Sequence, residues 1–77
     1  MVITFSGGKI IATPHELVVR LDGEHRVTLQ AQVDAIQLIG KGANVISANG
    51  SECKWSIKLD DEQQLREIAN EVGCDVL

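Results

Sequence analysis

The residues of this chain with the broadest chemistry are its two histidines and two cysteines, because together they form the donor set of a tetrahedral zinc site. They are His15, His25, Cys53 and Cys74. Structural zinc sites are usually built from close pairs of ligands in the sequence, and these four residues form no such pair. The spacing therefore predicts no metal site and no metal cofactor.

A cysteine nucleophile activated by a histidine base is a second chemistry that these residue types allow. Cys74 is expected to be the more exposed thiol, but Glu71 and Asp75 flank it and disfavour the thiolate that such catalysis needs. With only two cysteines, Cys53 and Cys74 are both predicted to be reduced thiols, with no disulfide between them. We expect no catalytic residue and no enzyme.

Two further motifs have structural explanations. Asp60, Asp61 and Glu62 lie at the start of a predicted helix, where carboxylates complement the helix dipole, and they lack the spacing of a calcium loop. The run from Ser6 to Lys9 contains the glycines and lysine of a phosphate loop, but a strand-like apolar sequence follows it instead of a helix. This run is predicted to be a hairpin turn.

Seven runs with strand-like hydrophobicity supply the elements that would position these residues. Most of them alternate apolar and polar side chains with a period of two, which is typical of a strand buried on one face. The predicted strands span residues 2–6, 9–13, 16–21, 24–31, 33–39, 43–48 and 51–59. The segment 30–38 could instead form a short helix. In the last strand, Trp55 is expected to face the core, with a subunit contact as the alternative.

Turn signals separate these runs at regular intervals. Gly7-Gly8, Pro14-His15 and the stretch 40–42 each mark a reversal of the chain. Asp22-Gly23 and Asn49-Gly50 are predicted to form two-residue hairpin turns, because their central positions require a positive φ.

The C-terminal part changes to a helical period. Leu65, Ile68, Ala69 and Val72 fall on one face of a helix predicted over about residues 61–72. Asp60 is the expected N-cap with Gln63 three residues later, and Gly73 can end the helix in the left-handed conformation.

Length and charge limit the range of functions. With 77 residues the chain is expected to form a single domain, 1–77, with one modest core. Residues 1–59 have six basic and five acidic side chains, whereas residues 60–77 have one basic and six acidic side chains, giving −4 in total. Because the C-terminal end is acidic and no basic run exists, we expect no nucleic-acid partner. No apolar stretch is long enough to insert into a membrane, and cytoplasmic residence is the default expectation.

The layout of seven short strands in hairpin order followed by one amphipathic helix resembles the small bacterial pleckstrin-homology-like domains. The stretches that bear this resemblance are GKIIATPHELVV, RVTLQAQVDAIQLIG and SECKWSIKLDDEQQLREIANEVG. The sequence also resembles an uncharacterised family of short proteobacterial proteins, which implies no activity. The expected fold is mainly β, an antiparallel sheet or a small, partly open barrel of about seven strands with a C-terminal helix.

Three functions remain open. The first is a non-enzymatic interaction domain that binds protein and forms a homodimer. Its basis is that Ile11, Val18 and Ile36 are out of phase with their inward neighbours, so they would lie either on a second buried face or outside, where they could form a contact surface. The second is a small-ligand or lipid-headgroup module, for which the mark would be a basic pocket built from Lys9, Arg20 and Arg26, partly offset by Glu16 and Glu24. The third is an acidic inhibitor that mimics nucleic acid through its C-terminal helix.

Overall fold

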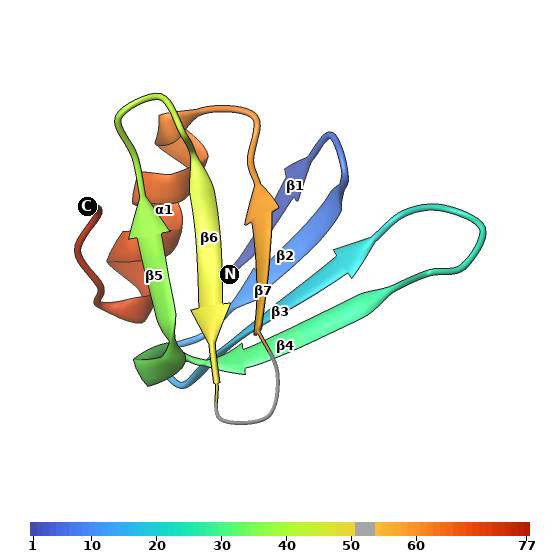
Figure 1. Cartoon of the computed structure of the whole chain (residues 1–77), viewed down its shortest axis with the longest axis horizontal. Coiled ribbons are helices and arrows are strands. Elements are labelled where there is room, and N and C mark those ends of the chain that lie inside the picture. The colour runs from blue at the N-terminus through green and yellow to red at the C-terminus, as the bar shows by residue number, and fades with distance from the viewer. Residues whose placement is uncertain (51–53) are drawn as a thin grey trace.

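The computed structural model describes residues 1–50 and 54–77, which form seven strands, one short 3₁₀ turn and one α-helix (Figure 1). The strands form two antiparallel sheets, one with the order β1-β2-β3-β4 and the other with the order β5-β6-β7, and they do not close into a barrel. This confirms the mainly β fold with a C-terminal helix. The elements are β1 (Val2–Phe5), β2 (Gly8–Ala12), β3 (Glu16–Leu21), β4 (Thr28–Gln32), η1 (Val33–Ala35), β5 (Ile36–Ile39), β6 (Val45–Asn49), β7 (Lys54–Lys58) and α1 (Glu62–Val72).

Within each sheet, neighbouring strands are consecutive along the chain, and the first two turns are tight. Phe5 pairs with Gly8 in the register of β1 and β2, so Ser6 and Gly7 form a two-residue turn instead of a phosphate loop. Between β2 and β3 the turn falls on Pro14-His15, where the N–H of Thr13 donates to the carbonyl of Glu16 at 3.0 Å. Both predicted reversals are therefore confirmed, although the first falls on Ser6-Gly7, one residue before the predicted Gly7-Gly8.

The next two predicted two-residue turns are wrong in length. Arg20 pairs with Thr28, so β3 and β4 are joined by a loop over residues 22–27, and β4 begins four residues later than predicted. Asn49 is the last residue of β6 and pairs with Lys54, so its connection to β7 is also longer than two residues, and part of it lies outside the described residues. Asp-Gly and Asn-Gly marked the reversals but not the length of the loops.

The ambiguous segment 30–38 contains both kinds of structure. It includes the end of β4, the single 3₁₀ turn η1 and the start of β5, so the chain leaves one sheet and enters the other at this turn. Ile36 follows the turn and is only 7% exposed. The prediction that Ile36 lies on an outer contact surface is therefore wrong, because the turn shifts the alternation and points this side chain into the core.

The core lies between the inner faces of the two sheets and one face of α1. It consists entirely of apolar residues among the described part of the chain. Trp55 and Ile57 on the inner face of β7 pack against it but stay half-buried, because β7 is an edge strand. The buried residues are Ile3, Phe5, Ile10, Ala12, Leu17, Val19, Ile36, Leu38, Ile46, Ala48, Leu59, Leu65, Ile68 and Val72.

Helix α1 has the predicted buried face and nearly the predicted ends. Leu65, Ile68 and Val72 are buried, Ala69 is half-buried, and Gly73 ends the helix with φ of 77°. The N-cap, however, is Asp61, whose carboxylate accepts the N–H of Gln64 at 2.9 Å. The prediction of Asp60 as N-cap is wrong by one residue, because the Asp60 carboxylate is occupied by another partner.

That partner is Ser6, in the turn between β1 and β2. Asp60 accepts the Ser6 N–H at 2.9 Å and its hydroxyl at 2.5 Å, and the hydroxyl bond is the main reason why the pKa of Asp60 lies below its ordinary value. Glu62 makes the corresponding contact to the other sheet, because it accepts the N–H of Lys41 in the loop between β5 and β6 at 3.2 Å. This bond, followed by the bond from Arg66, lowers the pKa of Glu62. The start of α1 is thus tied to both sheets.

The chain after α1 covers the outer edge of β5. Leu38 forms a parallel bridge with Val76, the N–H of Leu77 donates to the Leu38 carbonyl at 2.7 Å, and the N–H of Gly40 donates to the Leu77 carbonyl at 2.7 Å. Because these bonds occupy the edge of β5, this edge has little capacity left for pairing with another chain.

We predict that Leu65→Ala or Ile68→Ala lowers the free energy of unfolding by about 2–4 kcal/mol, because either change leaves a cavity where α1 packs between the sheets. Urea denaturation followed by circular dichroism measures this loss. Asn70→Ala, on the exposed face of the same helix, is the matched control and should leave stability nearly unchanged. A loss below about 0.5 kcal/mol in both core variants would contradict the packing.

We predict that Ser6→Ala raises the pKa of Asp60 toward its ordinary value, which an NMR titration of the side-chain carboxyl measures. The pKa values of Asp60 and Glu62 are lowered in the folded state. These two groups therefore stabilise the fold at pH values above the ordinary pKa of a carboxyl group. That contribution is lost as the pH falls through the lowered pKa values. Ser6→Ala should therefore lose less stability on acidification than the unchanged chain. Ser56→Ala serves as control, and an unaltered Asp60 titration in Ser6→Ala would refute the assignment.

Candidate functional site

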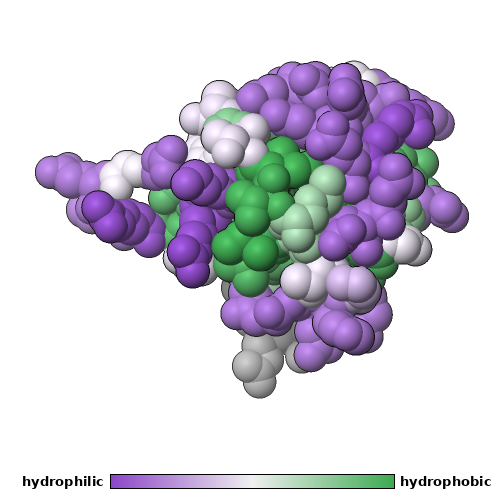
Figure 2. All heavy atoms as spheres, turned by 180° about the vertical axis from the view of Figure 1, so that it is seen from behind, coloured by the Kyte–Doolittle hydropathy of each residue, from purple (hydrophilic) through white to green (hydrophobic). Residues whose placement is uncertain are grey.

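The outer face of the four-stranded sheet has an apolar row across three strands. The register aligns Val2 of β1, Ile11 of β2 and Val18 of β3, and Gln30 of β4 continues the row. Val2 is 62% exposed, while Ile11 and Val18 are half-buried. Figure 2 shows an apolar patch on the rear of the molecule, surrounded by hydrophilic atoms. Two of the three residues predicted for a contact surface thus lie on one face, and Val2 joins them in place of Ile36.

A row of cationic and hydroxyl side chains lies directly beside the apolar row. Lys9 of β2 and Arg20 of β3 are cross-strand partners, with Thr4 and Thr28 at the two ends of the row. Lys9 is exposed because it alternates with the buried Gly8 and Ile10, and Arg20 is exposed because it follows the buried Val19. The period of two in β2 and β3 therefore places two positive charges side by side.

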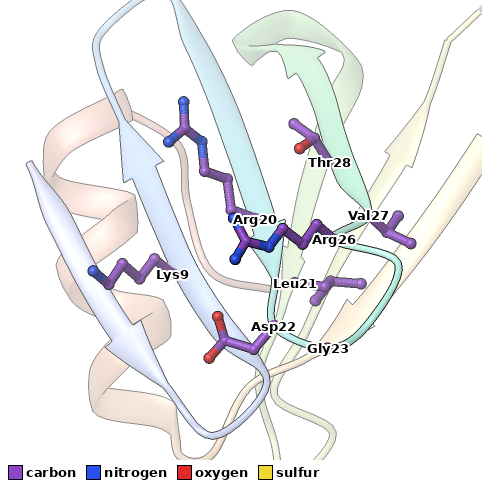
Figure 3. Close-up of a pocket in the computed structure, with 8 residues that line it drawn as sticks. All are labelled: Lys9, Arg20, Leu21, Asp22, Gly23, Arg26, Val27 and Thr28. Carbon is purple, nitrogen blue, oxygen red and sulfur yellow. The ribbon is translucent and has the colours of Figure 1, made fainter.

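The loop over residues 22–27 brings a third cation to this row. Gly23 has φ of 130° and Arg26 has φ of 47°, and these positive values turn the chain back toward the sheet. The Asp22 N–H donates to the Gly7 carbonyl at 2.9 Å and the Leu21 N–H donates to the Val27 carbonyl at 2.9 Å, which ties the loop to its base. In Figure 3 the side chain of Arg26 extends from this loop toward the strands that hold Arg20 and Lys9.

These side chains line a hollow of about 570 Å³. The structure thus brings together Lys9, Arg20 and Arg26, the three residues from which a basic pocket was predicted. Its lining residues are Lys9, Arg20, Leu21, Asp22, Gly23, Arg26, Val27 and Thr28.

The charges of the hollow are not balanced. It has three positive side chains and one negative side chain, a formal charge of +2 on a protein whose total is −4. Within the described part of the chain, none of its three cations lies within 4.0 Å of a carboxylate oxygen. Glu16, expected to offset the cations, instead accepts from the side-chain amide of Gln30 at 2.6 Å, and Glu24 does not line the hollow. The carboxylate that does lie there is Asp22, which the sequence marked only as a turn residue.

The other candidate residues are not brought together. His15 and His25 are exposed in two different loops, and Cys74 is half-buried with its sulfur 3.9 Å from the Val33 carbonyl. Cys53 lies outside the described residues, so its predicted reduced state stays a prediction. The residues that the structure describes include no group of three or more His, Cys, Asp or Glu side chains arranged to hold a metal ion.

The family of this chain is decided by one comparison. The family described as "Protein of unknown function (DUF3389)" matches residues 1–76. The chain belongs to this family. The prediction that the chain belongs to an uncharacterised family is thereby confirmed, and this DUF3389 chain has the mainly β fold described above. No curated protein and no solved structure matches the chain.

In the described residues of this DUF3389 chain, α1 is the one α-helix, and it is too short and too polar to cross a bilayer.

Gly8 is the residue that allows β2 and β3 to approach closely enough to set Lys9 beside Arg20. A Cβ atom at position 8 would collide with the backbone carbonyl of Arg20, and the backbone of Gly8 has φ of 153°. We predict that Gly8→Ala lowers the free energy of unfolding by about 1–3 kcal/mol and shifts the amide signals of Lys9 and Arg20. Gly8→Ala could destabilise the fold through the collision with Arg20 or through the positive φ. Gly23→Ala tests the positive φ alone, because nothing lies within 4 Å of a Cβ atom at that position. If both variants unfold at the same urea concentration, the collision at position 8 is refuted as the cause.

Proposed function

We propose that this protein is a non-enzymatic interaction domain of the cytoplasm that binds protein through the outer face of its four-stranded sheet, and that one partner is a second copy of itself. The row of Val2, Ile11 and Val18 is the observation that carries the proposal. Exposed apolar area that spans neighbouring strands is typical of contact surfaces. A domain of this size also gains stability from association, because its own core is small.

The charges on the same face favour a second copy as the occupant. Glu16, Val18 and Arg20 alternate along β3, so the apolar residue has a carboxylate on one side and a guanidinium on the other. A two-fold axis laid along the apolar row would set Val18 against its own copy and Arg20 over Glu16 of the second copy. Two symmetric ion pairs would then flank one apolar contact, which is the self-complementary pattern that a two-fold dimer requires.

The acidic face of α1 is proposed to stay outside this contact. Glu67 is exposed on α1, and like charges would meet if two helices faced each other across the axis. Glu71 is already 3.8 Å from the N-terminal amine of its own chain. The nucleic-acid-mimicking alternative has less support, because Glu62 of this acidic segment is already paired with Arg66 at 3.0 Å.

Kinship with the pleckstrin-homology-like domains is part of the proposal as well. Its support is the order of the elements alone, seven antiparallel strands in sheets of four and three followed by a helix.

We predict that the protein is a homodimer at micromolar concentration and that Val18→Glu converts it to a monomer, because two carboxylates would be buried against each other at the axis. Multi-angle light scattering measures the mass. Ser56→Glu adds the same charge to the outer face of the other sheet and should leave the dimer intact. A mass of one chain for the unchanged protein over the accessible concentration range would refute self-association.

Charge exchange tests the orientation of the two copies. Arg20→Glu alone and Glu16→Arg alone should each weaken the dimer, because each places like charges together across the axis. The double variant restores opposite charges and should recover the dimer. If the double variant is as weak as the worse single variant, the two-fold arrangement along the apolar row is wrong.

A further inference from the structure

We infer that the hollow lined by Lys9, Arg20 and Arg26 is a binding site for the phosphate group of a small, hydroxyl-bearing molecule. This inference goes beyond the proposed function, because it concerns a ligand other than protein and rests on the cations of the sheet face instead of its apolar row.

The first argument is the cost of the arrangement without a ligand. Lys9 and Arg20 are direct cross-strand partners, and like charges in that position destabilise a sheet. Arg26 is then added to the same hollow by a loop with positive φ, although no carboxylate of the described residues lies within 4.0 Å of any of the three. A bound anion would offset this repulsion.

The second argument is the type of the cations. Two of the three are arginines, whose planar guanidinium groups can each donate two parallel hydrogen bonds to the oxygens of a phosphate. They lie on different supports, Arg20 on β3 and Arg26 on the following loop, and both line the hollow. Lys9 adds a compact charge from β2.

The third argument is the size and the remaining lining of the hollow. Its volume of about 570 Å³ falls in the range typical of small-molecule sites and exceeds the space that one inorganic anion fills. Asp22 can accept a hydrogen bond from a ligand hydroxyl, and Thr28 can donate or accept one. A phosphate monoester of a polyol or a sugar would place its phosphate against the cations and its hydroxyl groups against Asp22 and Thr28.

Arg20 lines the hollow and also forms an ion pair in the proposed dimer, so a change at Arg20 would affect both proposals. The site is therefore tested through Arg26 and Lys9. The test uses the full chain and also a background that carries Ile11→Thr and Val18→Thr. These substitutions make the apolar row polar without changing its charge. Binding that persists in this background shows that the hollow does not depend on the proposed dimer, so the two proposals can fail separately.

The experiment is an NMR titration with glycerol 3-phosphate, with glycerol as the ligand control. We expect the phosphate ester, and not glycerol, to shift the amide signals of Lys9, Arg20 and residues 22–28. Arg26→Gln and Lys9→Gln should each weaken binding at least about tenfold, because each removes a charge-assisted contact. Lys58→Gln removes an exposed charge from the other sheet and should bind as the unchanged chain does.

A second arm locates the source of the phosphate. Vesicles of phosphatidylcholine with phosphatidic acid are compared with vesicles of phosphatidylcholine alone. Binding of glycerol 3-phosphate supports a free small molecule, whereas binding only to the phosphatidic acid vesicles, lost in Arg26→Gln, supports a lipid-borne phosphate. If neither probe binds, or if Arg26→Gln and Lys9→Gln bind as tightly as the unchanged chain, the site is refuted.

Discussion

The burial of one face of α1 is the interaction on which the rest of this structure depends. Within the described residues no backbone hydrogen bond joins a strand of one sheet to a strand of the other, so the sheets are held together by side chains. Leu65, Ile68 and Val72 supply the apolar surface that both inner faces need, and Asp60 and Glu62 tie the start of the helix to a loop of each sheet. Because all of these contacts come from one short segment, the two sheets have a fixed relative position.

Because α1 packs on the inner faces, it does not cover the outer face of the four-stranded sheet. Its inner side chains are committed to the core, and alternation then places Val18 and Arg20 outside without any cost to packing. The same backbone register therefore sets both the apolar row and the cation row. The proposed contact surface and the proposed phosphate site lie on neighbouring rows of the same strands and share Arg20.

Most of the fold could be predicted because the strands and the helix have strong local periods. Lys9 and Arg20 were expected on neighbouring strands for this reason, and they are cross-strand partners. The features that were missed depend on distant partners or on loop length. Asp60 and Asp61 are equivalent as local capping residues, and only Ser6, 54 residues away, decides between them. Asp22 could not be assigned to the hollow because the Asp-Gly pair predicts a turn but not the path of six loop residues.

The pairing of consecutive strands within each sheet has a consequence for how the molecule folds. β-Rich proteins are usually slow to fold, because their strands must find partners far away in sequence. Here each hairpin can form from a local segment, and the distant partners meet only when α1 docks. From this topology we expect the closure of the helix over the two sheets to be the slowest step of folding. Until the helix docks, both inner faces are open to solvent and to contact with wrong partners.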